Sequence, residues 1–268
     1  MESTLKYYRM RNYSLFSALV IAAALLTAFS YRKVTTVYLI GDSTVADYTL
    51  EDNYESRRYP IAGWGQLFQP FFVSDSLRHV RHLLGRANEV VVDNRAKGGR
   101  STRTFFQEGR WAAVYRDLRK GDVVMIQFGH NDAAENKPER YVDTMGYKAF
   151  LRLFVEQARQ KGALPILLTP VARNYPWQKG KLQHVHGGYP QAVKEVAAEL
   201  SVKLIDLNEL SMQHFSAKGQ SYVTEHYFMN LPAGKFEAYP GGQKDNTHFQ
   251  IAGGRAVAQL VFSAMKEL

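Results

Sequence analysis

The 268-residue sequence contains no cysteine, which excludes disulfide frameworks, cysteine-ligated zinc, iron–sulfur clusters and cysteine nucleophiles. It has only 9 prolines and no internal repeat or low-complexity tract. Hydrophobic residues make up 46% of the chain and charged residues 22%, which argues against a disordered, collagen-like or multi-span membrane protein. The length favours one large α/β domain or at most two small ones.

Acidic residues are in the minority, with 25 Asp and Glu against 34 Lys and Arg, for a formal net charge of +9. Such an excess of positive charge suits an acidic partner. Nucleic acid, an anionic membrane surface and an acidic polysaccharide all satisfy that description, and the charge alone does not choose among them.

The N-terminus has the layout of a secretory signal peptide. Three basic residues precede an uncharged run from Ser14 to Ser30. Ala28 and Ser30 suit a cleavage site, so we predict a signal peptide over 1–30 and a mature domain over 31–268. An uncleaved signal anchor is the alternative, because the run approaches the length of a membrane helix. The chain is therefore expected to be periplasmic or extracellular, with no access to nucleic acid and membrane contact only through an uncleaved anchor.

Short apolar runs alternate with helical patterns along the rest of the chain. The runs are rich in β-branched residues and nearly free of charge, as in strands buried on both faces of a parallel sheet; they cover 34–40, 90–92, 123–128, 166–169 and 203–207. Apolar residues at helical spacing predict helices over 143–161, 189–200 and 251–266. This alternation predicts a single doubly wound α/β domain.

Polar, glycine-bearing loops follow three of these strands, at 41–44, 94–101 and 129–132. Ligands of open parallel sheets bind at the carboxyl ends of the strands, so the three loops are expected to converge. A fourth polar segment at 245–248 precedes the last helix.

The converging loops contain the groups that acyl transfer by serine requires: a hydroxyl, a base, a group that orients the base, and donors for the oxyanion. Ser43 supplies a hydroxyl, Asp245 and His248 share one turn, Asn131 offers an amide, and Gly99 offers a bare N–H. Taken singly, each is also explained by an ordinary turn or a helix cap. Their combination, at one edge of the sheet, points to acyl transfer by a serine.

The same segments resemble the SGNH (GDSL) hydrolase superfamily, and within it the rhamnogalacturonan acetylesterases. The matching motifs are GDST at 41–44, AKGGRS at 96–101, IQFGHND at 126–132, HGGYP at 186–190 and DNTHF at 245–249. The resemblance implies a flavodoxin-like three-layer sandwich around a central parallel sheet of about five strands. Two segments depart from the family pattern. The basic stretch 74–89 either reshapes a wall of the cleft or extends a helix, and 224–244 matches nothing in the family.

The resemblance also implies roles for individual residues. Ser43 is the expected nucleophile, His248 the general base and acid, and Asp245 the carboxylate that orients His248. The backbone N–H groups of Ser43 and Gly99 and the side chain of Asn131 form the expected oxyanion hole. No cofactor or metal is required.

Further residues are candidates for contact with a sugar chain. Arg100 and Arg103 suit the carboxylates of a uronic acid, or a structural salt bridge. Trp177 suits stacking on a sugar, and His186 belongs to the HGGYP loop. The histidines at 184, 186 and 226 lack a further ligand at a diagnostic spacing, so no metal site is expected.

The sequence thus predicts an exported serine esterase that deacetylates an O-acetylated acidic polysaccharide, with pectic rhamnogalacturonan as the expected substrate. Some alternatives keep the serine chemistry and change the substrate to acetylxylan, a lipid or thioester, or an envelope polymer. Another keeps the chemistry and transfers the acetyl group to a sugar instead of water. A protein of another class, a non-catalytic carbohydrate-binding protein, is disfavoured by the intact candidate triad.

Overall fold

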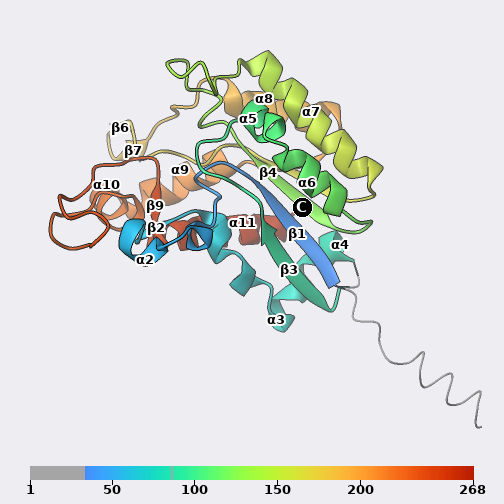
Figure 1. Ribbon diagram of the computed structural model, residues 1–268, viewed down its shortest axis with the longest axis horizontal. Helices are drawn as coiled ribbons and strands as arrows, with labels where there is room; N and C mark the ends of the chain where they lie inside the picture. The colour runs from blue at the N-terminus through green and yellow to red at the C-terminus, as the bar shows by residue number, and fades with distance from the viewer. Residues whose placement is uncertain (1–33, 86) are drawn as a thin grey trace, which may run out of the picture. The chain divides into compact units, whose positions relative to one another are not determined.

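The computed structural model in Figure 1 describes residues 34–85 and 87–268. The predicted signal peptide lies outside the described residues. Within them, none of the helices combines the length and the apolar character that crossing a membrane requires.

A five-stranded parallel sheet with strand order β3-β1-β4-β5-β8 forms the centre of the described chain. Its strands are β1 (Val34–Gly41), β3 (Glu89–Asn94), β4 (Val123–Gln127), β5 (Leu164–Leu168) and β8 (Lys203–Ile205). Successive side chains of a strand point to opposite faces of a sheet. In β1, Val37 and Leu39 enter one core cluster, while Tyr38 and Ile40 enter another. Both faces of the sheet are therefore buried, as the uninterrupted apolar runs predict.

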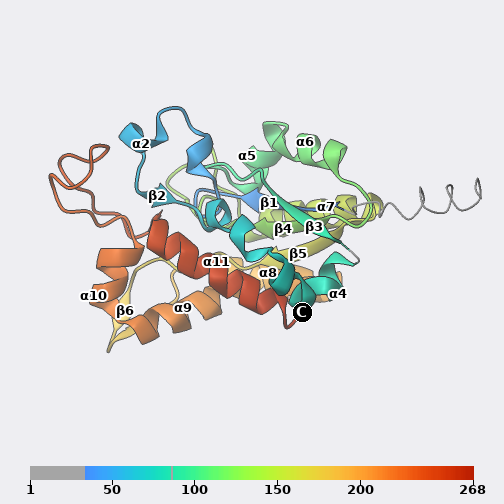
Figure 2. The same ribbon diagram turned by 90° about the horizontal axis from the view of Figure 1, so that it is seen from below.

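Helices cover both faces, and Figure 2 shows α11 on one side of the sheet and α5 and α6 on the other. One layer consists of α5 (Thr102–Gln107), α6 (Arg110–Asp117), α7 (Thr144–Gln160) and α8 (Tyr189–Glu199). The opposite layer is built from η2 (Trp64–Leu67), η3 (Gln69–Phe71), α3 (Ser74–Leu77), η4 (Arg78–Val80), α4 (Arg81–Leu84), α9 (Leu207–Lys218) and α11 (Ile251–Met265). These three layers confirm the predicted doubly wound α/β fold.

The three helices predicted from periodicity are α7, α8 and α11, each within a residue or two of its expected ends. The segment 74–89 forms α3, η4 and α4, which pack on the core through Leu77, Val80 and Leu83. The described residues of this segment extend a helical layer, and none of them lines the cleft described below, so for them the alternative of shaping the cleft is wrong.

Short elements surround the carboxyl end of the sheet. They are η1 (Tyr48–Leu50), α2 (Tyr54–Arg57), the antiparallel pair β2 (Ile61–Ala62) and β9 (Phe249–Gln250), the hairpin β6 (Trp177–Gln178) and β7 (Lys181–Leu182), α10 (Gln220–Tyr222) and the π-helix η5 (Val223–Tyr227). Pairing of β2 with β9 ties the chain just after 245–248 to the segment that follows β1.

Candidate active site

The loop after β1 carries Ser43 into a narrow space beside β4. A Cβ atom on Gly41 would lie 2.5 Å from the carbonyl oxygen of Gln127, so only glycine fits there without displacing backbone. Asp42 then closes the turn, because its Oδ1 accepts hydrogen bonds from the N–H and hydroxyl of Thr44 at 2.9 and 2.8 Å. These contacts fix the backbone on both sides of Ser43, which is 8% exposed.

The structure brings the three predicted catalytic residues together across 205 positions of sequence. Ser43 Oγ lies 2.9 Å from His248 Nε2, and His248 Nδ1 lies 2.7 Å from Asp245 Oδ2. The other carboxylate oxygen, Oδ1, accepts hydrogen bonds from the N–H groups of Thr247 at 2.7 Å and His248 at 3.1 Å. The carboxylate is therefore held at both oxygens while it contacts the imidazole.

The surroundings of Asp245 favour its ionised form. Burial opposes ionisation of Asp245, but its hydrogen bond to His248, the charge of His248 and the two backbone N–H groups outweigh burial and lower the pKa of Asp245. An ionised Asp245 accepts the Nδ1 proton of the neutral imidazole. His248 Nε2 then carries a lone pair directed at the Ser43 hydroxyl, the arrangement that a general base needs.

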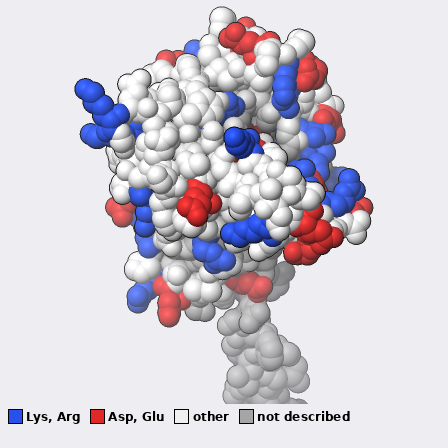
Figure 3. All heavy atoms as spheres, turned by 90° about the vertical axis from the view of Figure 1, so that its left-hand side faces the viewer, with Lys and Arg blue, Asp and Glu red and all other residues white. Residues whose placement is uncertain are grey.

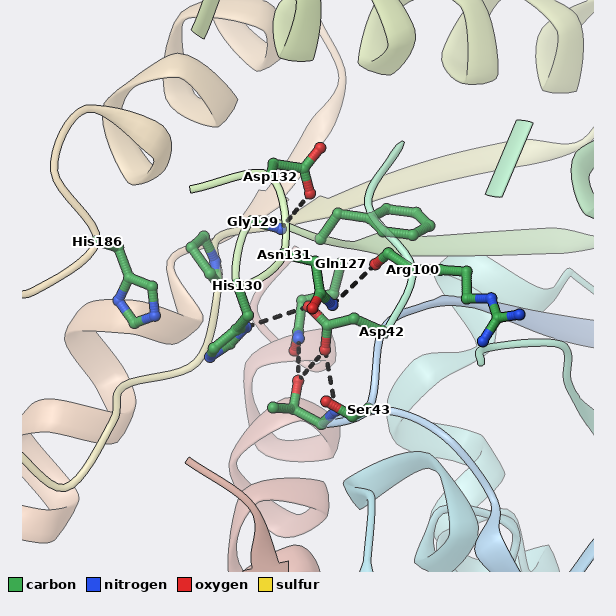
Figure 4. A network of polar contacts seen from close by, with 12 residues as sticks. Asp42, Ser43, Arg100, Gln127, Gly129, His130, Asn131, Asp132 and His186 are labelled. Atoms are coloured by element: carbon green, nitrogen blue, oxygen red, sulfur yellow. Dashed lines mark hydrogen bonds and ion pairs between the residues drawn. The ribbon is translucent and has the colours of Figure 1, made fainter. Parts of the chain in front are cut away.

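The three residues predicted to supply oxyanion donors, Ser43, Gly99 and Asn131, line one cleft. Gly99 has φ +80°, a conformation that favours glycine, and it lines the cleft with Ser43 and Asn131. Within the described residues, the backbone N–H groups of Ser43 and Gly99 make no hydrogen bond. Asn131 Nδ2 donates one hydrogen to the carbonyl oxygen of Arg100 at 3.0 Å, as Figure 4 shows, and keeps a second for a ligand.

A buried contact connects the loops that carry the nucleophile and the amide. His130 Nδ1 lies 3.2 Å from Asp42 Oδ2, and the two side chains are 3% and 0% exposed (Figure 4). Burial opposes the ionisation of Asp42, but the charge of His130 and its hydrogen bond, together with Thr44, lower the pKa of Asp42. His130 thus donates from Nδ1 to a carboxylate, and neither residue was identified from the sequence, although each is adjacent to a predicted site residue.

Ser43 and its partners line a cleft of about 780 Å³. Of the predicted substrate residues, Arg100 and His186 line it, and Arg103 and Trp177 do not. Arg103 instead donates to the carbonyl oxygen of Pro138 at 2.7 Å. Trp177 packs against the core and donates from Nε1 to Asn174. These two expectations need correction, because both side chains are occupied by structural contacts.

Arg100 lies in the cleft but is already neutralised. Its Nε donates to both carboxylate oxygens of Glu108 at 3.0 Å, and its Nη1 donates to the carbonyl oxygen of Gly98 at 2.8 Å. Of the two readings of Arg100 from the sequence, the salt bridge describes what its side chain does in this structure.

His186 is 3% exposed and stacks edge-on against His130, with ring centroids 4.7 Å apart. Asn208 Nδ2 donates to the carbonyl oxygen of Pro170 at 2.8 Å and lies 3.3 Å from His186 Nδ1. The amide orientation therefore makes Nδ1 an acceptor and leaves the ring proton on Nε2. Burial, followed by the charges of His130 and Arg173, lowers the pKa of His186, so this ring is neutral near pH 7.

No group of three potential metal-ligating side chains occurs among the described residues. His184 Nδ1 lies 2.9 Å from Asn208 Oδ1, and His226 lies on η5. His184 and His186 thus contact the same side chain, that of Asn208, whereas His226 lies on a different element.

Five cations of the cleft wall escaped the sequence reasoning: Arg58, Lys97, Lys137, Arg140 and Arg173. Apart from Lys97, they come from segments without a motif, where no periodicity indicates which side chains point into the cleft. Only their charge, and for Lys97 its position within the AKGGRS motif, was visible beforehand.

Comparison with known proteins finds relatives that are named as esterases. The rhamnogalacturonan acetylesterase RhgT of Bacillus subtilis is 37% identical over 237 residues, which cover 88% of this chain and 92% of RhgT. The probable rhamnogalacturonan acetylesterase YesY of the same organism is 38% identical, over 87% of this chain and 93% of YesY. The crystal structure of B. subtilis YxiM superimposes with a TM-score of 0.69 at 28% identity, over 88% of this chain and 57% of that one.

Residues 39–253 match the GDSL-like Lipase/Acylhydrolase family, a range that contains all of the residues discussed above. The expected resemblance is therefore confirmed, and an enzymatic activity on carboxylic esters follows from the family. The chain belongs to the GDSL-like lipase/acylhydrolase family and is a carboxylic ester hydrolase.

Proposed function

We propose that the protein is an exported serine esterase that removes acetyl groups from an O-acetylated acidic polysaccharide, with pectic rhamnogalacturonan as the substrate. The observation that carries the proposal is the aligned series Ser43 Oγ, His248 Nε2, His248 Nδ1 and Asp245 Oδ2, with contacts of 2.9 and 2.7 Å. Two relatives that cover most of the chain and are named as rhamnogalacturonan acetylesterases support the substrate.

In the proposed reaction, Ser43 Oγ attacks the acetyl carbonyl carbon while His248 Nε2 takes the hydroxyl proton. The carbonyl oxygen becomes an oxyanion that accepts hydrogen bonds from the N–H groups of Ser43 and Gly99 and from Asn131 Nδ2. His248 then gives its proton to the departing sugar oxygen, and the C–O bond breaks to leave an acetyl-serine. Water, deprotonated by His248, attacks the acetyl-serine, and acetate and the Ser43 hydroxyl are released.

The test measures acetate released from native acetylated rhamnogalacturonan by the wild type and by Ser43→Ala. We expect release by the wild type alone, and covalent labelling of the wild type alone by a serine-directed phosphonate. Labelling without release from this polymer, together with release from acetylxylan, would keep the esterase and overturn the substrate. A wild type that is folded yet unlabelled and inactive on all esters would overturn the catalytic roles.

Export is the second part of the proposal, and the N-terminal pattern of residues 1–30 supports it. Mass spectrometry of the protein isolated from the growth medium or periplasm is expected to find an N-terminus at Tyr31. An intact N-terminus in a membrane fraction would show instead that the segment is an uncleaved anchor.

A further inference from the structure

The cations that line the cleft differ in whether a carboxylate already neutralises them. Arg58 and Lys97 both lie 3.2 Å from Glu51, and Arg100 is held by Glu108. Lys137 has no carboxylate partner within the described residues. The same wall carries Arg140, whose nearest carboxylate is the exposed Glu139 at 3.9 Å. Arg173 also has no carboxylate partner among the described residues, but its Nη1 and Nη2 donate to the Tyr175 hydroxyl at 2.8 Å and the His130 carbonyl oxygen at 3.3 Å. Lys137 and Arg140 make no such hydrogen bonds, so the positive charge of this wall is at most weakly compensated by the protein itself.

The face shown in Figure 3 carries charges of both signs. Figure 3 looks onto the side of the molecule that carries α2, α10 and β6 in Figure 1, and acidic and basic side chains are interspersed over it. A uniformly basic surface would attract any polyanion. Lys137 and Arg140, whose side chains make no hydrogen bond among the described residues, instead mark one position along the cleft.

Arg140 has an unused guanidinium. Among the described residues its side chain makes no hydrogen bond, and the contact of its buried Nε with Glu139, at 3.9 Å, is too long to be one. The side chain is nevertheless only 22% exposed. A guanidinium that is shielded from water normally forms hydrogen bonds with other groups of the protein. The N–H groups of Arg140 form none among the described residues, so they are available to a ligand.

The guanidinium lies next to the reaction centre. A Cβ atom built on Gly98 would lie 3.6 Å from Ser43 Cβ, and one built on Gly99 would lie 3.6 Å from Arg140 Nη1. The two adjacent glycines thus separate the nucleophile from Arg140. A sugar whose ester is at Ser43 has its neighbour in the polymer, or its own far side, beside Arg140.

The loop that carries Arg140 is held in place. Arg103 Nη2 donates to the Pro138 carbonyl oxygen at 2.7 Å, and the Tyr189 hydroxyl donates to the Val142 carbonyl oxygen at 2.7 Å. The N–H of Val142 also donates to the carbonyl oxygen of Asp132 at 3.0 Å, which ties the loop to the Asn131 loop. Arg140 is therefore prepositioned relative to the oxyanion donors, which reduces the entropy lost on binding.

We propose that Arg140, assisted by Lys137, binds a uronic acid carboxylate on the acetylated sugar or on its neighbour in the polymer, and so makes the enzyme select acidic over neutral acetylated polymers. The inference rests on the proposed esterase function and deepens it. A planar guanidinium matches a carboxylate with two parallel N–H···O bonds, and Lys137 adds a second positive charge. A neutral sugar offers hydroxyl groups only and gains nothing from that charge.

The experiment compares two forms of one substrate. Acetylated rhamnogalacturonan is used as such and after its carboxylates have been converted to methylamides with a carbodiimide at mildly acid pH. The readout is the ratio of kcat/KM on the acidic polymer to kcat/KM on the amidated polymer. It is measured for the wild type, Arg140→Gln and Arg140→Lys. Arg116→Gln is the matched control, since Arg116 is 73% exposed on α6 and lies outside the cleft.

The wild type and Arg116→Gln are expected to prefer the acidic polymer by the same ratio. Arg140→Gln should lower that ratio about 10- to 100-fold, mainly through KM, because it removes a charged hydrogen-bonded pair. Arg140→Lys should restore part of it, since it keeps the charge and loses the fork.

Two results would overturn the inference while leaving the esterase intact: a ratio that Arg140→Gln does not change, or equal losses on both polymers. Equal losses would mean that Arg140 acts on the reaction centre or maintains the shape of the cleft. Hydrolysis of p-nitrophenyl acetate by the wild type separates these results from failure of the proposed function. A wild type active on that ester and inactive on the acidic polymer would refute the substrate and the role of Arg140 together.

Discussion

Replacing Asp245 by Asn tests the orientation of the base. Asp245 Oδ1 accepts hydrogen bonds from the N–H groups of Thr247 and His248 at 2.7 and 3.1 Å, so the oxygen of an Asn must stay there to satisfy both donors. Its NH₂ group then occupies the position of Oδ2, 2.7 Å from His248 Nδ1. Nδ1 becomes an acceptor, and the ring proton moves to Nε2, which faces the Ser43 hydroxyl. His248 can then no longer accept the proton of the Ser43 hydroxyl, although all non-hydrogen atoms keep their positions.

A wrong tautomer of this kind lowers kcat about 10⁴-fold in serine hydrolases, which corresponds to about 5 kcal/mol of transition-state stabilisation. We expect a loss of that order for Asp245→Asn, with KM on p-nitrophenyl acetate nearly unchanged. Asp47→Asn is the matched control, because Asp47 Oδ1 also accepts the N–H of a threonine, Thr49, at 2.9 Å and lies outside the cleft. Thermal unfolding of both variants checks that they fold. A folded Asp245→Asn enzyme that keeps more than about a tenth of the wild-type kcat would refute the assigned role.

Three further predictions concern the oxyanion hole, acid stability and packing. Asn131→Ala should lower kcat about 10²- to 10³-fold on any ester while labelling by a phosphonate persists at a reduced rate; an unchanged kcat would remove Asn131 from the oxyanion hole. The pKa of His186 is lowered by burial, so below about pH 6.5 the unfolded chain takes up a proton that the folded chain does not, and stability falls as pH falls. In urea titrations between pH 7 and 5, His186→Gln should reduce that slope by up to about 1.4 kcal/mol per pH unit, and a slope equal to that of the wild type would contradict the neutral state of His186. Gly41→Ala should lower the free energy of unfolding by about 1–3 kcal/mol, because its Cβ would lie 2.5 Å from the Gln127 carbonyl oxygen; a stability equal to the wild type would show that the loop can move aside.

The sheet and the long helices follow from local pattern, because burial on two faces demands uninterrupted apolar strands and burial on one face demands helical spacing. The prediction is weaker for elements that depend on distant partners. β2 and β9 are two residues long, and they exist because Ile61 pairs with Gln250 and Ala62 with Phe249. Nothing in either short segment alone indicates that pairing.

The same distinction separates the motif residues of the site from the charged side chains of the cleft wall. The motif residues could be located because strand ends converge, whereas the direction of a loop side chain depends on what surrounds it. Arg103 and Arg140 illustrate this, since both were available as carboxylate ligands from composition alone. Arg103 is used to hold the loop at Pro138, while Arg140, two residues further along that loop, points into the cleft with its donors unused.

The motifs contain more residues than the chemistry needs, and a chain of buried hydrogen bonds explains why. Trp64 Nε1 donates to Gln127 Oε1 at 2.8 Å, and Gln127 Nε2 donates to Thr44 Oγ1 at 2.7 Å. Thr44 in turn donates to Asp42, which accepts from His130. Each member is buried, so removing one leaves an unsatisfied partner at a cost of about 1–3 kcal/mol.

This chain joins the loop that carries the nucleophile to the loop that carries the oxyanion amide, because Asp42 and His130 are each adjacent to one of those groups. A shift of either loop would break hydrogen bonds that no water can replace at this depth. The relative position of Ser43 Oγ and Asn131 Nδ2 is therefore set by groups that take no part in the reaction. His130→Ala should therefore lower kcat by misplacing both groups, and the loss on p-nitrophenyl acetate should match the loss on the polymer. Substitution of Arg140, in contrast, should affect the acidic polymer more than its amidated form.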